Sequence, residues 1–326
     1  MMNIRIKSIF TFIMLLVVSL FFTQCAKDDD IAAKDGNGTL RLEITDGPID
    51  DASVAGAFVT VTEIKVDGKS YEGFQGKQTI DLLAYQKGAV ALLGTGELEA
   101  GTYTNLTLVL DYSKDAAGNA PGCYVLTKDN KKHDLSLNGS STNEVTFAAG
   151  SINIEKENQT DLVLDFDLRK AIKADMSGGE SKYAFVTGAE LNAAVRAVKK
   201  GSTGIVKGSA SSSTNFADQV VVYAYKKGTY DANVEMKGQG TSMVEFANAV
   251  TSAKVDASGN FELHFLEEGD YELHFAAYDD TNNDGSYELK GSLMLNILAG
   301  LDLNAISVGA NATVTLDISV TGVLPL

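Results

Sequence analysis

The chain is poor in the residues that supply cross-links and nucleophilic chemistry. Its 326 residues include two cysteines, three histidines, three prolines and no tryptophan. It has neither a Gly-x-Ser-x-Gly sequence nor a glycine-rich phosphate loop before a helix, so nothing indicates a serine hydrolase or a nucleotide-binding enzyme. With Cys25 modified as argued below, Cys123 has no partner for an intramolecular disulfide. A lone cysteine of this kind is typically a small buried apolar residue.

Basic residues are also scarce. The chain has 27 Lys and Arg against 43 Asp and Glu, which gives a formal net charge of −16. A surface of this sign repels phosphate backbones, so the composition argues against a nucleic-acid partner. It suits an acidic ectodomain that can attract cations.

The N-terminus has the pattern of a lipoprotein signal peptide. Arg5 and Lys7 precede an apolar run at 9–22, which is short for a membrane span and suitable for a signal-peptide core. Cys25 follows this run. We therefore expect residues 1–24 to be removed and the Cys25 thiol to carry a diacylglyceryl group, so that lipid chains anchor the protein to a membrane.

This segment resembles the signal peptides of Bacteroidetes lipoproteins, although residues 22–24 depart from the stricter Leu-Ala-Gly type. In that group, a lysine and acidic residues after the cysteine act as a signal for export to the outer face of the outer membrane. The matching residues here are Lys27, Asp28, Asp29 and Asp30. The resemblance implies an outer-membrane protein facing the cell exterior. The alternative is an ordinary acidic linker on a protein that faces the periplasm.

The rest of the sequence predicts an all-β fold of two tandem β-sandwich domains. There are 31 glycines and many short stretches of alternating apolar and polar residues, such as 40–44, which is typical of strands joined by tight turns. We place a tether at 25–37, one sandwich at 38–200 and a second at 201–326. The predicted strands are 40–44, 57–66 with a bulge between Val61 and Ile64, 78–83, 103–110, 124–126, 144–147, 162–168, 183–186, 205–209, 219–225, 243–247, 253–255, 261–265, 271–278, 287–293 and 313–320.

Two segments are ambiguous, and one motif occurs in both halves. Residues 190–198 have helical spacing, but we favour a strand, and 82–93 has room for one short helix. The sequences at 98–103 and 266–271 share a Leu-Glu-x-Gly-x-Tyr pattern, in which Gly permits a tight connection and Tyr opens the next strand. The repeat supports tandem sandwiches.

The first half resembles a known domain family. The segments 38–48, 81–83, 98–103 and 164–167 match, in order, the lipoprotein domain catalogued as domain of unknown function 4382. The match spans about 38–198 and departs at Ala100, where family members often have proline. The second half is similar to carboxypeptidase-regulatory or prealbumin-like sandwiches through 256–261 and 266–271. These resemblances imply a surface lipoprotein without assigned chemistry and a spacer or adhesive module.

One loop has the spacing of calcium ligands. Oxygen-bearing side chains alternate from the first to the ninth position of the loop, with Gly285 at the sixth, an arrangement that lets a short loop wrap Ca²⁺. The candidate ligands are Asp280, Asn282, Asp284, Ser286 and Glu288. The twelfth-position glutamate of an EF-hand is absent, so the alternatives are a structural calcium site and a plain hairpin turn.

Two further clusters of polar residues have alternative interpretations. If 261–275 forms a hairpin, Glu262, His264, Glu272 and His274 share one face, as zinc ligands or as solvated cross-strand pairs. Asp161, Asp165 and Asp167 alternate with apolar residues on one strand. They are either glycosidase-like carboxylates or, as we favour, a solvated acidic stripe.

The sequence therefore predicts a non-catalytic, lipid-anchored surface protein. We expect a structural or adhesive envelope module whose partners are the membrane, through its lipid, and surface proteins or glycans. No cofactor is required, apart from the structural Ca²⁺ considered above. The alternative is a glycan-binding lipoprotein of a polysaccharide-uptake system, against which the lack of tryptophan counts.

Overall fold

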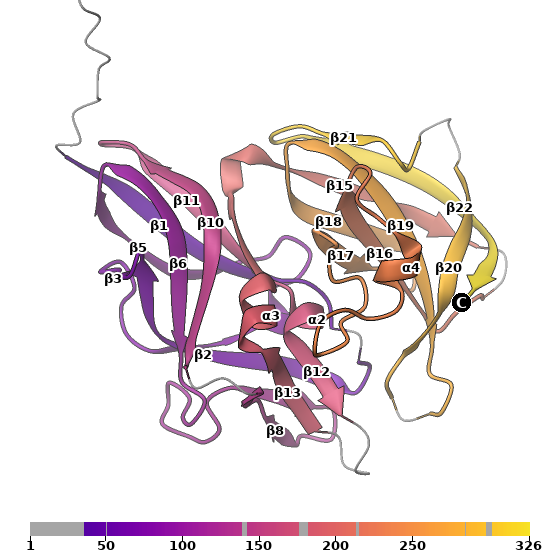
Figure 1. Cartoon of the computed structure of the whole chain (residues 1–326), viewed down its shortest axis with the longest axis horizontal. Helices are drawn as coiled ribbons and strands as arrows, with labels where there is room; N and C mark the ends of the chain where they lie inside the picture. The colour runs from indigo at the N-terminus through magenta and orange to yellow at the C-terminus, as the bar shows by residue number, and fades with distance from the viewer. Residues whose placement is uncertain are drawn as a thin grey trace, which may run out of the picture.

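The computed structural model describes residues 36–49, 51–138, 142–175, 182–212, 215–283, 285–297 and 302–326. Within these residues the chain forms four β-sheets with a few short helical turns, so the all-β prediction is confirmed (Figure 1). The predictions for Cys25, for Lys27 to Asp30 and for Asp284 lie outside the described residues.

Two sheets of the first half pack face to face. Leu40, Leu42 and Ile44 alternate with polar residues along β1 (Asn37–Asp46) and are fully buried between the layers. This is the period of two expected of a strand with one face on the core. One sheet has the order β14 (Val195–Lys199), β11 (Gln159–Phe166), β1 (Asn37–Asp46), β5 (Ala91–Glu99). The other has the order β10 (Glu144–Ile154), β6 (Gly101–Leu110), β2 (Val54–Val66), β7 (Tyr124–Thr127), β8 (Lys132–Asp134), with β3 (Lys69–Ser70) and β4 (Gln78–Asp81) also paired to β2.

A small third sheet and short helices complete this half. The sheet has the order β12 (Ile172–Asp175), β13 (Lys182–Thr187), β9 (Leu137–Asn138). The helical turns are η1 (Leu82–Ala84), α2 (Leu168–Ala171), α3 (Gly188–Ala193) and η2 (Lys200–Ser202). Helices α2 and α3 lie beside the second half, so they can contribute to the junction between the halves (Figure 1).

The second half is built on one eight-stranded sheet whose two ends face each other. The order is β17 (Thr251–Lys254), β16 (Gln219–Lys226), β19 (Gly269–Asp279), β20 (Glu288–Ile297), β22 (Thr313–Pro325), β15 (Thr203–Ser211), β18 (Asn260–Glu267), with β21 (Ile306–Val308) paired to β19. A short helix, α4 (Ala232–Glu235), follows β16. Residues from all over this sheet form one buried cluster, as in a sandwich.

The repeated motif forms the same local structure in both halves. Tyr103 Oη donates to the Glu99 carbonyl at 2.8 Å, and Tyr271 Oη donates to the Glu267 carbonyl at 2.8 Å. The first motif joins β5 to β6, which lie in different sheets, and the second joins β18 to β19, which are not paired. The motif therefore marks a crossing between layers. Of the two motif glycines, Gly101 and Gly269, it is Gly269 whose backbone favours glycine, because its φ is 149°.

The predicted hairpin at 261–275 is wrong. Strand β18 pairs with β15, and β19 pairs with β16, β20 and β21. The apolar residues nevertheless face the same core from opposite layers, and Phe261 meets Phe275 edge to face with ring centroids 5.3 Å apart. The alternation was correct, but a crossing between layers replaces the hairpin turn.

Other predicted elements differ in part. Residues 243–247 form turns around an isolated bridge between Gln239 and Val244 rather than a strand. Residues 190–198 divide into the end of α3 and strand β14, so the helix and the strand that we considered each account for part of the segment. The strand β5 was not predicted, while the bulge in β2 is confirmed as a register shift between Val61 and Glu63.

Candidate functional site

The outer face of the β14–β11–β1–β5 sheet is covered by the second half of the chain. Val163 and Val198 on this face are buried against Phe265 of β18. Between them, Asp165 accepts hydrogen bonds from Arg196 Nε at 2.9 Å and Nη2 at 2.6 Å, while Arg196 Nη1 donates to the Phe265 carbonyl at 2.9 Å. An arginine fork thus joins a carboxylate of one half to the backbone of the other.

The predicted solvated acidic stripe is therefore wrong for Asp165 and Asp167, both of which are buried. Asp167 caps helix α2, accepting from the Lys170 backbone N–H, and lies 3.4 Å from Arg169 and 3.5 Å from the Lys170 ammonium. Asp161, at the far end of β11, is partly exposed. Residues of alternating polarity on a strand predict an outward face, but not what covers that face.

Helix α2 extends two cationic side chains into the second half. Arg169 Nη2 donates to the Phe246 carbonyl at 3.1 Å, Nη1 donates to the Glu245 carbonyl, and the guanidinium lies 4.9 Å from the centre of the Tyr223 ring. Lys170 Nζ donates to the Ala249 carbonyl. Only 5% of the Arg169 side chain is exposed. These contacts explain why the 243–247 segment is held as turns.

Helix α3 makes a second link. Glu190 accepts hydrogen bonds from the Ser242 backbone N–H at 2.9 Å and from its hydroxyl at 2.5 Å. It also accepts from the backbone and hydroxyl of Thr187, which closes the capping box of α3. Burial alone would raise the pKa of Glu190, but the hydrogen bonds from Ser242 and Thr187 outweigh it and lower the pKa to about 2. The carboxylate is thus ionised at neutral pH and bridges the halves.

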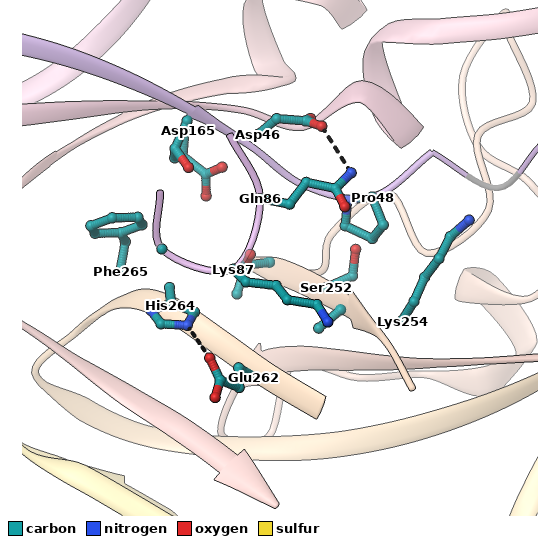
Figure 2. Close-up of a pocket in the computed structure, with 14 residues that line it drawn as sticks. Asp46, Pro48, Gln86, Lys87, Asp165, Ser252, Lys254, Glu262, His264 and Phe265 are labelled. Atoms are coloured by element: carbon teal, nitrogen blue, oxygen red, sulfur yellow. Dashed lines mark hydrogen bonds and ion pairs between the residues drawn. The ribbon is translucent and has the colours of Figure 1, made fainter. Parts of the chain in front are cut away.

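A pocket opens between these links (Figure 2). One wall comes from the end of β1 and the loop at 86–88, and the other comes from β17 and β18, the two edge strands of the second-half sheet. The empty space, including the open mouth, is about 510 Å³. The polar side chains that line it are Thr45, Asp46, Gln86, Lys87, Asp165, Thr251, Ser252, Lys254, Glu262 and His264. Pro48 and Phe265 add apolar surface.

Asp46 is a buried carboxyl group in the lining of this pocket. It accepts from the Leu168 backbone N–H at 3.2 Å and from Gln86 Nε2 at 3.4 Å, the latter contact being visible in Figure 2. Burial raises the pKa of Asp46 well above its ordinary value, and the nearby Asp167 and Asp165 carboxylates add to the rise, while the two hydrogen bonds oppose it. In its protonated form, the carboxyl both donates and accepts hydrogen bonds.

Ser252 of β17 presents an unpaired hydroxyl to the same pocket. The residue is 6% exposed, and its Oγ has no hydrogen-bond partner within the described residues. In Figure 2 the hydroxyl points toward Gln86 and Pro48. A buried hydroxyl without a partner is costly, so such a group calls for a bound molecule or water. No sequence signal marked Ser252, because nothing local distinguishes it from the chain's other serines.

Two residues lining the pocket have strained backbones. Lys87 has φ of 54° and Phe265 has φ of 55°, in the left-handed region that favours glycine. A left-handed Phe is uncommon and persists only where the surroundings hold it, here through the contact of its carbonyl with Arg196. The next residue, Gly88, packs against His264. A Cβ added at Gly88 would lie 2.5 Å from the imidazole Nδ1.

The structure separates the four residues predicted to share a hairpin face. His264 hydrogen-bonds Glu262 at 2.9 Å at the pocket, whereas His274 stacks on Tyr230 with ring centroids 3.5 Å apart. Burial lowers the pKa of His274 despite the neighbouring Glu272. Within the described ranges, no group of three or more His, Cys, Asp or Glu is arranged to hold a metal ion. The zinc alternative for these four residues is therefore not assembled in the described part of the chain.

The predicted calcium loop is only partly described. Glu288 accepts from the Thr281 backbone and hydroxyl at 3.0 and 2.9 Å and from the Asn282 amide at 3.2 Å, and Asp280 accepts from the Gly285 backbone at 3.1 Å. The loop thus closes on itself as a hairpin turn does. Ser286 forms a β-bridge with Asp51 of the first half. Since Asp284 lies outside the described residues, the calcium site stays a prediction.

Cys123 is a buried free thiol. Burial raises its pKa to about 12, which makes it an unreactive core residue as expected. The helices of the described part of the chain include none that is long and apolar enough to cross a membrane.

Comparisons with solved structures find similar proteins at low identity. The Bacillus anthracis TIE protein is 12% identical with a TM-score of 0.19, over 87% of this chain and 34% of its own. The minor pilin GBS52 of Streptococcus agalactiae is 14% identical with a TM-score of 0.20, over 88% and 97%. The major pilin subunit BcpA of Bacillus cereus is 11% identical with a TM-score of 0.21, over 87% and 70%.

The chain thus spans about a third of the TIE protein, and TM-scores near 0.2 carry no argument about fold or function. No protein with a curated description matches the sequence. Residues 37–186 match the family model described as "Domain of unknown function (DUF4382)". This stretch runs from the first residue of β1 to the last residue but one of β13. The resemblance noted for the first half is therefore confirmed for this stretch.

Proposed function

We propose that the protein is a non-catalytic module of the cell envelope. In this proposal, lipid on Cys25 holds it in the outer membrane, Lys27 to Asp30 direct it to the outer face, and the two β-sandwiches give structural support or adhesion at the cell surface. The basic start, apolar core and cysteine of the N-terminal segment support the anchor.

One observation carries the non-catalytic part of the proposal. Two of the carboxylates that could have served glycosidase-like chemistry are instead held by cations at the junction of the halves: Asp165 by Arg196, and Asp167 by Arg169 and Lys170. A carboxylate that is engaged by an arginine fork and covered by the second half is not presented to a substrate. The same contacts fix the relative position of the sandwiches, as suits a module that bears load or presents a surface.

The anchoring is tested by labelling cells with a radioactive fatty acid and treating intact cells with protease. Wild-type protein is expected to incorporate label and to be digested without permeabilisation of the outer membrane. Cys25→Ser should lose the label. Replacing Lys27 to Asp30 by alanine should keep the label but protect the protein from external protease. Digestion that requires permeabilised cells would place the wild-type protein in the periplasm and contradict surface display.

The rival function is glycan binding in a polysaccharide-uptake system. The pocket at the junction favours it, because its polar lining and unpaired Ser252 hydroxyl suit a hydroxyl-rich ligand. A glycan array separates the two. Saturable sugar binding, with uptake of the same polysaccharide lost on deletion of the chain, would favour the rival over a purely structural module.

A further inference from the structure

The pocket between the two halves has the features of a built binding site rather than a packing gap. Its walls come from β1 and the loop at 86–88 on one side and from the edge strands β17 and β18 on the other. The contacts of Arg196 with Phe265 and of Lys87 with Asp256, at 4.0 Å, hold these walls together. The pocket therefore exists only when both halves are in place.

The groups facing the pocket share one kind of hydrogen bonding. Ser252 carries a hydroxyl without a partner, Gln86 carries a carboxamide, and Asp46 carries a buried carboxyl that forms no ion pair within the described residues. A hydroxyl, a carboxamide and a protonated carboxyl each both donate and accept. A ligand hydroxyl has the same dual capacity, so it can satisfy all three groups at once.

Charge and shape narrow the ligand class further. The acidic groups facing the pocket are Asp46, Asp165 and Glu262, and the basic ones are Lys87 and Lys254. Arg196 neutralises Asp165, and His264 hydrogen-bonds Glu262, so neither sign dominates. The empty space, with its open mouth, is about 510 Å³, and Pro48 and Phe265 supply apolar surface in its lining. A neutral ligand with both hydroxyl groups and an apolar ring face therefore suits this pocket.

We propose that this pocket binds a neutral saccharide, with its exocyclic hydroxymethyl group entering between Ser252, Gln86 and Asp46. This inference names a ligand for the proposed adhesive role and rests on that role for its biological meaning, but the binding itself stands on the pocket. Ser252 acts by contacting the sugar hydroxyl. Because the sugar supplies one missing hydrogen-bond partner and makes few other contacts, a single sugar unit binds weakly, with a dissociation constant on the order of 1 mM.

The test uses the full-length lipidated protein in a detergent without a sugar headgroup. Saturation-transfer NMR is recorded with the methyl glycosides of glucose, galactose, mannose and N-acetylglucosamine, each beside its 6-deoxy analogue. At least one glycoside is expected to bind saturably with the strongest transfer to its C6 protons, and its 6-deoxy analogue should bind about three- to tenfold more weakly, the effect of one hydrogen bond.

Variants locate the site. Ser252→Ala should weaken binding about three- to tenfold without lowering the melting temperature, because the lost hydroxyl has no partner in the protein. Asp46→Asn, which keeps size but changes the donor pattern, should also weaken binding. The matched control is Ser307→Ala, at an exposed serine of β21 that is not part of the pocket lining.

Three results would overturn the inference: no saturable binding of any of these glycosides, equal binding of a glycoside and its 6-deoxy analogue, or binding unchanged by Ser252→Ala. A melting temperature raised by KCl or CaCl₂ in the wild type but not in Asp46→Asn, without sugar binding, would assign the pocket to a cation and also overturn it. If the saccharide binding is not found but intact cells still adhere through the protein, the proposed function stands without this inference.

Discussion

Arg169→Ala should uncouple the two sandwiches. The substitution removes a guanidinium that is 5% exposed, donates to the carbonyls of Glu245 and Phe246, and lies 3.4 Å from Asp167. Removing one partner of a buried ion pair costs about 3–5 kcal/mol, because the other charge stays buried. Lys170 remains 3.5 Å from Asp167 and offsets part of this loss. We therefore expect the free energy of unfolding to fall by about 3 kcal/mol.

The assay is urea unfolding followed by circular dichroism and tyrosine fluorescence. Wild-type protein should unfold in one transition if the junction couples the halves, and Arg169→Ala should separate it into two. The matched control is Arg41→Ala, because Arg41 pairs with Glu43 at 2.9 Å while being 37% exposed, and Lys200 also bonds Glu43. That control should cost less than about 1 kcal/mol. Equal effects of the two substitutions would refute the role assigned to Arg169.

Four further predictions follow from single groups. The pKa of Glu190 is lowered to about 2, so its contribution to folding stability is complete at pH values above its ordinary pKa and is lost as the pH falls toward 2. Glu190→Gln should remove this part of the acid destabilisation, and Ser242→Ala should remove most of it. Parallel curves of unfolding free energy against pH for wild type and Glu190→Gln would contradict this. Cys123, whose pKa is raised to about 12 by burial, should react with a thiol reagent only after unfolding in urea, and rapid native reaction would show that it is accessible. Tyr271→Phe should lower the free energy of unfolding by about 1–2 kcal/mol, because a backbone carbonyl and a lysine lose their partner; calorimetry showing no change would count against the shared crossing motif. Ca²⁺ should raise the melting temperature of wild type and not that of Asp284→Ala, and equal shifts would remove the calcium site.

The strands that alternate regularly could be predicted from the sequence. Leu40, Leu42 and Ile44 predict β1 with the correct buried face, because the period of two depends only on local geometry. The bulge near Val61 was visible for the same reason, as a change in that period. Strand β5 was missed, since its sequence at 91–99 mixes glycines and acidic residues and its burial pattern is irregular.

The junction could not be predicted, because it depends on which surfaces meet. Asp165 and Val163 occupy the outer side of β11, and alternation assigns that side to solvent. The hairpin at 261–275 failed for a related reason: a tight Gly-x-Tyr connection suits a crossing between layers as well as a turn within one. Ser252 carries no signal at all, since its hydroxyl matters only through the groups of the other half that surround it.

In the proposed function, the protein acts by being held at the cell surface. The most direct measurement is the adhesion of intact cells to one another and to a mucin-coated surface, compared among cells with wild-type protein, with Cys25→Ser and without the chain. We expect wild-type cells to adhere more strongly than cells without the chain, and we expect Cys25→Ser to abolish the difference. Adhesion that is unchanged by Cys25→Ser, or by loss of the whole chain, would contradict it.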